Sequence, residues 1–174
     1  LHSGIIYSNR GGNAIKQLME SLSQENYNCR MVQMGHVESS MVNILEGMKN
    51  VEIHNSASVE ETLKYCQLAK AFFIPDMVAQ KDYSPFLPSK FVYRIMDPQP
   101  IVVYSKKASD MHDYAVEYPE AGIFWAEEGN IESLKRAVKD AFECDIEKID
   151  RTRIREWFSE QTIARNFTKT VADT

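Results

Sequence analysis

The sequence lacks the features that mark membrane, secreted and nucleic-acid-binding proteins. No apolar run approaches the roughly 20 residues of a membrane-spanning helix, and no signal-peptide pattern stands at the N-terminus. Basic residues are in the minority, with 20 Lys and Arg against 25 Asp and Glu and a net charge of −5, so nucleic acid is not an expected partner. We expect a soluble cytoplasmic protein, and any membrane contact would be peripheral, at the inner face, through a longer full-length protein.

Cysteine and histidine are sparse and scattered. The three cysteines, Cys29, Cys66 and Cys144, form no CxxC or Cys/His pattern, which argues against a disulfide framework and a structural zinc site. They are typical of buried thiols in a reducing compartment. The four histidines have no partner at metal-ligand spacing, so the sequence predicts no metal site.

Length and composition favour one compact domain. The chain has 174 residues, 44% of them hydrophobic, which suffices for a sizeable core and is short for two full domains. We expect residues 1–174 to form a single domain with a helical tail over 145–174, in which Ile154 and Phe167 are among the apolar contacts. Because the sequence starts at Leu1 and not at Met, we expect it to be excised from a longer two-domain chain.

Short apolar runs alternate with helical patterns along the chain. Four runs are apolar throughout, which is typical of strands buried on both faces of a parallel sheet, and two are weaker. Amphipathic patterns separate them. The sequence therefore predicts an α/β, Rossmann-like fold: an open parallel sheet of about six strands with helices on both faces and right-handed crossovers. The expected strands lie at 4–7, 31–34, 51–53, 71–74, 101–104 and 122–125.

One helical pattern makes an explicit prediction about burial. Ser58 and Glu61 have capping-box spacing, so a helix should begin just after Ser58. The spacing then places Val59, Leu63 and Cys66 on its inner face.

Three polar segments should converge at the carboxyl edge of the sheet, where open parallel sheets bind their ligands. At the segment Arg10-Gly11-Gly12, backbone N–H groups at the start of a helix could contact a phosphate, and Arg10 would add positive charge. A Gly-Gly pair before a helix is also explained by turn geometry alone, because glycine tolerates positive φ. The segments are Arg10-Gly11-Gly12, His54-Asn55-Ser56 and the loop 76–88.

A second anion site is predicted at Pro88-Ser89-Lys90, where another helix begins. Pro88 suits a first helical turn, Ser89 offers a hydroxyl, and Lys90 can reach a phosphate at the positive helix end. The alternative is an ordinary solvated lysine. The sequence has no Walker motif, no GxGxxG and no local Ser/His/Asp set, so the catalytic residues stay unassigned.

Taken together, these segments resemble the C-terminal, donor-nucleotide-binding domain of the GT-B glycosyltransferases, particularly the large group 1 family. The likeness spans nearly the whole chain and rests on the order and spacing of its pieces. The stretch from Pro88 to Val103 is similar to a family passage in which Pro-Ser-Lys, an aromatic residue and a helix precede a strand. Residues 51–75, 122–132 and 157–159 are similar to further family passages.

The resemblance implies a glycosyltransferase that binds a nucleotide-sugar donor and passes the sugar to a glycan or lipid-linked acceptor, as in polysaccharide biosynthesis. It implies no cofactor and no required metal, since positive charge and helix dipoles would stabilise the leaving nucleoside diphosphate. Acceptor and catalytic residues would come from a missing N-terminal domain, so the isolated domain should bind donor without turnover. The implied residues are Arg10, Gly11, Gly12, Ser89 and Lys90 for the pyrophosphate, and His54, Asn55 and Ser56 for the base.

The sequence departs from that family at the ribose. Relatives often carry two glutamates separated by seven residues, and Pro85 and Tyr93 stand at the corresponding positions here. A tyrosine hydroxyl can hydrogen-bond a diol, so the ribose is assigned to Tyr93. Two alternatives stay open. One is a glycosyltransferase-derived domain that has lost donor binding; the other is a flavodoxin-like, receiver-type binding module, suggested by Asp76 and Lys106 after two strands.

Overall fold

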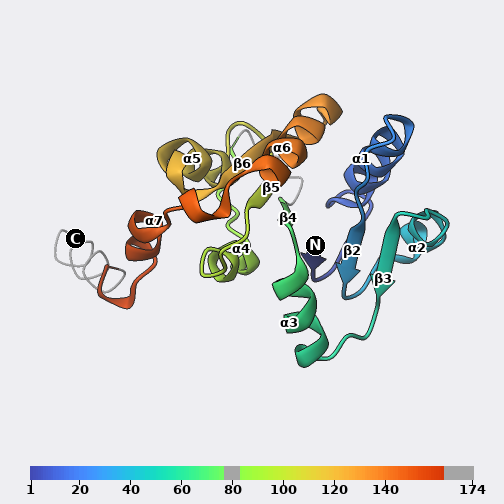
Figure 1. The fold of residues 1–174 in the computed structure, drawn as a ribbon, viewed down its shortest axis with the longest axis horizontal. Coiled ribbons are helices and arrows are strands. Elements are labelled where there is room, and N and C mark those ends of the chain that lie inside the picture. The colour runs from blue at the N-terminus through green and yellow to red at the C-terminus, as the bar shows by residue number, and fades with distance from the viewer. Residues whose placement is uncertain (77–82, 163–174) are drawn as a thin grey trace.

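The computed structural model describes residues 1–76 and 83–162, which fold into alternating strands and helices (Figure 1). The strands are β1 (His2–Ser3), β2 (Met31–Met34), β3 (Val51–His54), β4 (Phe72–Pro75), β5 (Ile101–Ser105) and β6 (Ile123–Glu127). The α-helices are α1 (Gly12–Gln24), α2 (Ser39–Glu46), α3 (Val59–Leu68), α4 (Ser89–Arg94), α5 (Asp110–Glu117), α6 (Ile131–Glu143) and α7 (Thr152–Trp157). Two short 3-10 turns, η1 (Pro119–Ala121) and η2 (Ile146–Lys148), complete the described chain.

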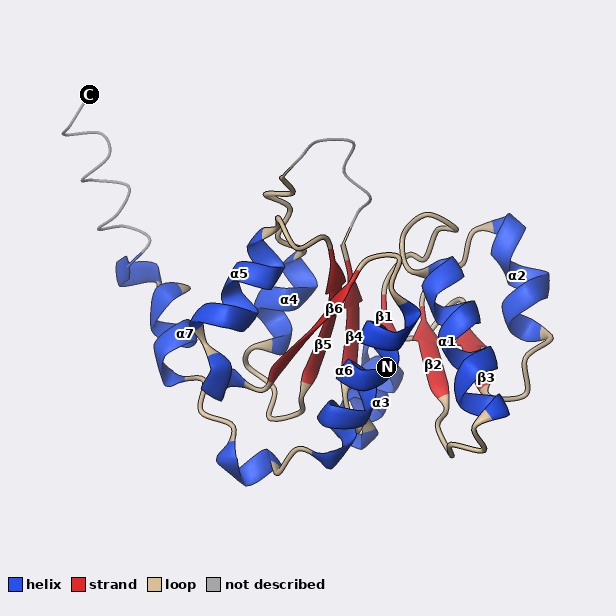
Figure 2. Ribbon diagram, turned by 90° about the horizontal axis from the view of Figure 1, so that it is seen from above, coloured by secondary structure: helices blue, strands red, loops and turns tan. Residues whose placement is uncertain are grey.

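The strands form two three-stranded parallel sheets, and the single sheet that the sequence predicted was wrong in this respect. The orders are β1-β2-β3 and β4-β5-β6, and Figure 2 shows the two sheets side by side. At the seam between β1 and β4, the carbonyl of Leu1 accepts from the N–H of Phe73 at 2.8 Å, and the Leu1 nitrogen donates to Ala71 at 2.9 Å. Because β1 is two residues long and ends at Ser3, just before Gly4 with its φ of +130°, this pairing does not extend into a ladder.

The first expected strand, 4–7, was also wrong. Ile6 makes an isolated bridge with Val37, and the carbonyl of Tyr7 accepts the N–H groups of Arg10 and Gly12. The apolar run therefore makes isolated bridges and leads into a turn at Ser8 and Asn9, and it buries Ile6 completely without forming a strand. The other five strands lie within two residues of their expected positions.

Helices cover both faces of the sheets, as predicted. In β4, Phe73 points into a core shared with α1, α2 and α6, whereas Phe72 and Ile74 point into a second core shared with α4, α5 and α7. The alternation follows from the period of two along a strand, so a fully apolar strand supplies both cores. The α/β class with helices on both faces is confirmed.

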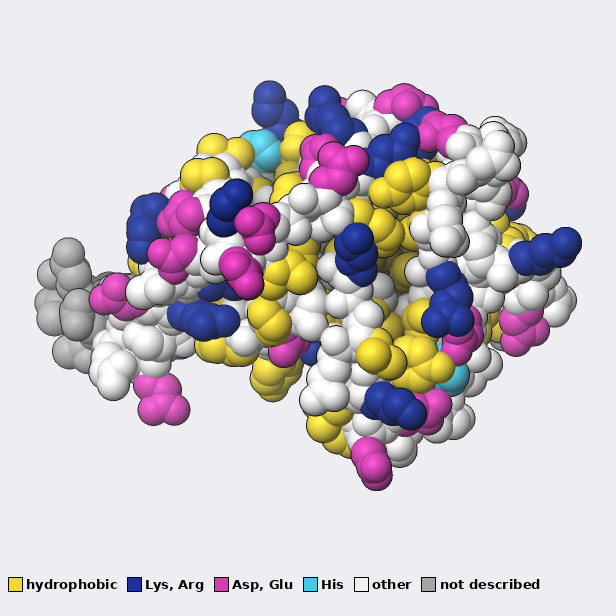
Figure 3. Space-filling view, in the orientation of Figure 1, with side chains coloured by type: hydrophobic (Ala, Val, Ile, Leu, Met, Phe, Trp, Pro, Cys, Tyr) yellow, Lys and Arg dark blue, Asp and Glu magenta, His cyan; other side chains and the backbone are white. Residues whose placement is uncertain are grey.

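Side chains fill most of the seam between the two sheets. The core that contains Phe73 also contains Ile15 and Met31 from the first half of the chain. A small apolar cavity of about 40 Å³ remains there, lined by Leu1 and Phe142 among others. Figure 3 shows apolar side chains along the recess between the two halves. Packing, more than strand pairing, holds the halves together.

The burial expected for α3 was only partly right. Its start is as predicted, because the hydroxyl of Ser58 accepts the N–H of Glu61 at 3.1 Å. Cys66 is buried, but Val59 is 78% exposed and Leu63 is 57% exposed. No described element covers the helix face that carries these two residues, since α3 reaches the second core only through Cys66.

Arg151 fastens the start of the C-terminal tail to the body of the fold. Its side chain is 3% exposed, and its Nε donates to the carbonyl of Ala121 at 2.7 Å. Nη1 donates to the carbonyls of Arg94, at 3.0 Å, and Asp97, and Nη2 donates to that of Gln99 at 2.7 Å. Burial lowers the pKa of Arg151 to about 10.

The tail expected over 145–174 is helical in its described part, where Ile154 is fully buried in the second core. Phe167, a further expected contact, lies outside the described residues. None of the described helices has the length and the apolar sequence that crossing a bilayer requires.

Candidate functional site

The carboxyl ends of β1, β2 and β3 form a compact backbone edge. The N–H of Gly4 donates to Met34 at 2.6 Å, and the N–H of Gly35 donates to His54 at 2.8 Å. A Cβ on Gly35 would lie 2.7 Å from the carbonyl oxygen of Gly4, so only glycine permits this approach. The edge therefore exposes backbone in place of bulky side chains.

Lys90 reaches this edge from α4. A Cβ on Gly4 would collide with the Cε and Nζ atoms of Lys90, so the lysine side chain lies directly against the glycine. Pro88 stands at the start of α4, as the residue immediately before its first helical residue, Ser89, and α4 has six residues. Lys90 is half-buried, which separates it from the ordinary solvated lysine of the alternative interpretation.

Arg10 lies beside the segment that leads into α4. Its guanidinium is 5.2 Å from the ring centroid of Phe86, and its Nε is buried with no hydrogen-bond partner among the described residues. Burial lowers the pKa of Lys90, and the positive charges of Arg10 and Arg94 lower it further. The two predicted anion-binding cations are therefore neighbours.

The charges of Arg10 and Lys90 are not balanced within the described part of the chain. Arg94, by contrast, donates to Asp97 at 2.6 Å and stacks over Phe72 at 4.6 Å. Across residues 1–76 and 83–162, no acidic side chain lies within ion-pair distance of Arg10 or Lys90. Two adjacent cations without a counter-charge create a local positive potential that favours an anion.

The glycine turn uses much of its own hydrogen-bonding capacity. The N–H groups of Arg10 and Gly12 donate to Tyr7 at 3.1 and 3.0 Å, and that of Asn13 donates to Ser8 at 3.2 Å. Gly11 has φ +83°, and a Cβ there would lie 2.7 Å from Cγ of Pro75. Turn geometry is thus sufficient to explain the pair, and a phosphate role for Gly11 and Gly12 stays a prediction.

The turn predicted to contact the base lies at the same edge, about 10 Å from β1 by two strand spacings. Both ring nitrogens of His54 already face carboxylates: Nε2 is 2.6 Å from Glu52 and Nδ1 is 3.0 Å from Glu61. Asn55 and Ser56 are exposed. A base contact would therefore involve these two residues more readily than the His54 ring, and the assignment stays a prediction.

Ser89 and Tyr93 flank Lys90 on α4. Ser89 is exposed at the first position of the helix, and Tyr93 is 71% exposed one turn later. Residues three apart on a helix lie on neighbouring positions of one face, so the Tyr93 hydroxyl is available to a ligand held by Lys90. The ribose role of Tyr93 is untested by this geometry and stays a prediction.

A buried polar pair that no sequence motif marks lies beneath this edge. His2 is 3% exposed and Gln33 1% exposed, and Nδ1 of His2 lies 2.6 Å from Oε1 of Gln33. Nε2 of Gln33 donates to Gly4 at 2.6 Å and to Gly35 at 3.1 Å. Burial lowers the pKa of His2 to about 3, assisted by the charges of nearby Lys90 and Arg10. The sequence feature that could have indicated this pair is Gly4, which follows the end of β1 and does not begin a strand.

The loop 76–88 is attached at both described ends. The N–H of Asp76 donates to Tyr104 at 2.8 Å, and the N–H of Ser84 donates to Ala108 at 2.9 Å. The part of the loop between 77 and 82 lies outside the described residues. Both attachments connect the loop to β5 or to the segment that follows it.

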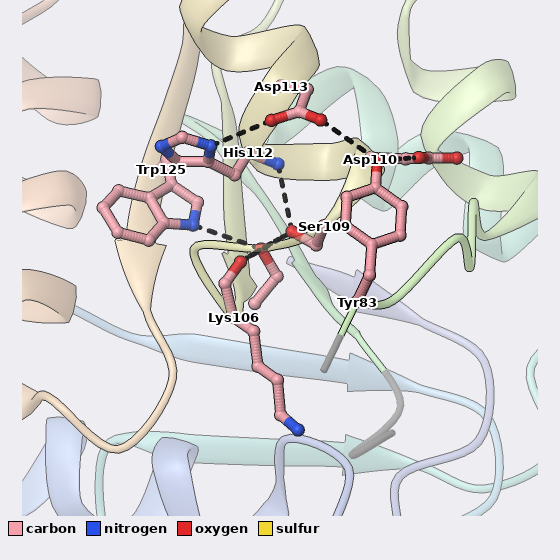
Figure 4. Close-up of polar contacts among 8 residues, drawn as sticks. Tyr83, Lys106, Ser109, Asp110, His112, Asp113 and Trp125 are labelled. Carbon is pink, nitrogen blue, oxygen red and sulfur yellow. Dashed lines mark hydrogen bonds and ion pairs between the residues drawn. The ribbon is translucent and has the colours of Figure 1, made fainter. Parts of the chain in front are cut away.

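Tyr83 strengthens the second attachment. Its hydroxyl donates to Asp110 at 2.5 Å and to Asp113 at 3.0 Å, both on the first turn of α5 (Figure 4). These carboxylates raise the pKa of Tyr83, mainly through the hydrogen bond to Asp110. Figure 4 also shows Lys106 extending away from this cluster.

Asp76 and Lys106, which suggested a receiver-type module, follow the neighbouring strands β4 and β5. Asp76 is buried. Among the residues described, no group of three or more His, Cys, Asp or Glu side chains is arranged to hold a metal ion.

Comparison with solved structures identifies the fold. No protein-family model and no curated protein matches the sequence. The C-terminal domain of a group 1 family glycosyl transferase, LpcC, from Francisella tularensis superposes with a TM-score of 0.60 at 10% identity, over 93% of this chain and 86% of that one. A UDP-forming α,α-trehalose-phosphate synthase from Burkholderia xenovorans gives 0.60 at 13% identity, over 98% and 43%.

A third match is the α,α-trehalose 6-phosphate synthase of Burkholderia multivorans, with a TM-score of 0.54 at 10% identity, over 99% of this chain and 43% of that one. The chain thus spans less than half of the synthases that it matches. The chain therefore belongs to the class of Rossmann-like α/β domains with parallel sheets. More particularly, it has the fold of the C-terminal domain of GT-B glycosyltransferases, and this prediction is confirmed.

Proposed function

We propose that this domain binds a nucleotide-sugar donor through its diphosphate, for sugar transfer to a glycan or lipid-linked acceptor. One observation carries the proposal: Arg10 and Lys90 lie close enough at the carboxyl edge to repel each other, and neither forms an ion pair with an acidic side chain in the described chain. A glycosyltransferase fold and a cationic site at the ligand-binding edge are the combination that such a donor requires.

The chemistry of the leaving group fits two cations. When the bond to the sugar breaks, negative charge grows on the nucleoside diphosphate, and a fixed positive charge stabilises this charge without reorganising. Burial lowers the pKa of Lys90, repulsion from Arg10 lowers it further, and an anion placed between the two cations would relieve this repulsion. Each charge-assisted hydrogen bond could contribute about 1.5 to 3 kcal/mol. In this proposal no metal ion and no cofactor is needed.

The other assigned residues complete the donor site in the proposal. Tyr93 bonds the ribose hydroxyls, Ser89 and the Gly11-Gly12 turn lie at the pyrophosphate, and the turn His54-Asn55-Ser56 lies at the base. Since one matched synthase is UDP-forming, UDP is the first nucleotide to test.

The acceptor and the catalytic residues would come from an N-terminal domain that the chain does not include. This fits the share of the synthases that the chain covers. The isolated domain would accordingly bind donor without turnover. The full-length protein would work in the cytoplasm, in polysaccharide biosynthesis, with peripheral contact to the inner face of the membrane.

Isothermal titration calorimetry with UDP and GDP tests the proposal. We expect saturable binding that weakens at least about tenfold in Lys90→Ala and in Arg10→Ala, the equivalent of one charge-assisted hydrogen bond. Lys64→Ala removes an exposed lysine from α3 and should leave the affinity unchanged. Equal losses in Lys64→Ala and Lys90→Ala would contradict a specific site.

The same titration separates the alternatives. No binding of either nucleotide would favour a glycosyltransferase-derived domain that has lost donor binding. The supporting observation for this alternative is the glycine turn, whose N–H groups bond within the turn. Magnesium-dependent phosphorylation of Asp76 without nucleotide binding would favour the receiver-type module.

A further inference from the structure

The donor site is built over a buried, uncharged polar pair whose hydrogen bonds have one consistent direction. The amide nitrogen of Gln33 donates to two carbonyls, those of Gly4 and Gly35. The amide oxygen must therefore be the atom that faces His2, and it can only accept. Nδ1 of His2 consequently carries the proton, since the 2.6 Å contact needs a donor.

This network continues to Lys90 without a gap. Gln33 fixes the carbonyl of Gly4, a residue whose φ of +130° is open to glycine and strained for other residues. The aliphatic end and the ammonium of Lys90 lie against that same glycine. The orientation of Gln33 thus sets the backbone surface on which the lysine rests, and His2 sets the orientation of Gln33.

Resting on the proposed donor site, we propose that His2 and Gln33 are positioning residues that hold Lys90 in place for the diphosphate. The pair does so without adding charge. A protonated imidazole here would repel Lys90 and Arg10, and burial keeps His2 neutral in the physiological range. A buried polar network in which every donor has an acceptor specifies one arrangement, which a lysine on a flexible stem needs.

Four variants test this role. His2→Leu and Gln33→Leu each break the network, whereas His2→Asn keeps a side-chain N–H near the position of Nδ1. Gln99→Leu is the matched control, because Gln99 is also a buried glutamine, and it donates to the carbonyl of Cys66 away from the site. Urea denaturation of all four confirms that each is folded under the conditions of the assay.

Two measurements are made on each variant. Calorimetry gives the dissociation constant for UDP, and carbon-13 NMR of the lysine Cε gives the titration midpoint of Lys90. We expect about tenfold weaker UDP binding in His2→Leu and Gln33→Leu, and a Lys90 midpoint shifted upward by about half a pH unit as the ammonium gains solvent. His2→Asn should restore most of both values, and Gln99→Leu should change neither.

The outcomes distinguish this inference from the proposed function. If Lys90→Ala abolishes UDP binding but His2→Leu and Gln33→Leu bind like the wild type, the donor site stands and the positioning role is wrong. If the wild type binds no nucleotide, the proposed function fails, and the Lys90 midpoint alone decides the positioning role. An unchanged midpoint in both leucine variants, or an equal shift in Gln99→Leu, overturns it.

Discussion

Replacing Arg151 by Met should be among the most damaging substitutions in the described chain. Methionine keeps much of the unbranched side-chain volume and removes every donor of the guanidinium. The backbone carbonyls of Ala121, Asp97 and Gln99 would lose their partner at once, and that of Arg94 would keep only the N–H of Asp97. Because these carbonyls belong to two separate connections, the loss would also free the start of the tail.

The expected magnitude follows from the burial of the four acceptors. The bonds to Ala121 and Gln99 are buried, and those to Arg94 and Asp97 are partly buried, so water can replace the latter two. An unsatisfied buried acceptor costs about 1 to 3 kcal/mol, which gives about 2 to 6 kcal/mol for two. For a chain of this length that corresponds to a fall in Tm of about 4 to 24 °C.

Urea denaturation and thermal melting followed by circular dichroism measure this effect. Arg151→Lys should be intermediate, since one ammonium cannot reach four carbonyls in the fork geometry of a guanidinium. Arg153→Met is the control: Arg153 is exposed and pairs with Glu120 at 2.9 Å, so its loss should cost less than about 1 kcal/mol. A free energy of unfolding for Arg151→Met within about 0.5 kcal/mol of the wild type would refute this reasoning.

Three further predictions concern the site and the pairing of the first and sixth helices. Gly4→Ala should lower the free energy of unfolding by about 1 to 3 kcal/mol, because φ is +130° there, and should weaken UDP binding by displacing Lys90; urea denaturation and calorimetry measure both. Tyr93→Phe should weaken UDP several-fold and leave inorganic pyrophosphate unaffected, and equal losses for both ligands would contradict the ribose assignment. Hydrogen bonds from Lys135 and then Lys139 lower the pKa of Glu25 from 4.5 to about 2. A lowered carboxyl pKa stabilises the fold above pH 4.5, and this contribution is lost as the pH falls toward 2, so Glu25→Gln should flatten stability against pH in that window, measured by thermal melts.

Much of the fold was predictable because the chain obeys simple periodicities. Runs such as Ile101–Val103 are apolar at every position, and strands buried on both faces need this pattern. The first strand was not predictable by the same rule. The apolar run that begins at Gly4 makes only isolated bridges, whereas the polar residue His2 lies in the strand, with its bond to Gln33. Tertiary pairing, which a local pattern does not contain, decided the outcome.

The cationic residues of the candidate site were predictable from the sequence, but the buried residues beneath them were not. Arg10 lies in the turn before α1 and Lys90 lies in the first turn of α4, positions that the topology brings to one edge. Their neighbours were invisible to motif reasoning, because Gln33 lies mid-strand and carries no signature. The exposure of Leu63 was likewise unpredictable, since amphipathic spacing indicates a face but not whether another element covers it.

If the domain binds a diphosphate as proposed, the break between β1 and β4 would give the bound anion a mechanical role. Arg10 belongs to the half of the molecule that contains β1, whereas Lys90 stands on α4, which packs on β4. A diphosphate that contacts both would span a junction with little backbone pairing and would link the two halves of the molecule. Binding of the diphosphate should therefore slow amide hydrogen exchange at Phe73 and Gly4, which lie on opposite sides of that junction, more than in the middle of either sheet.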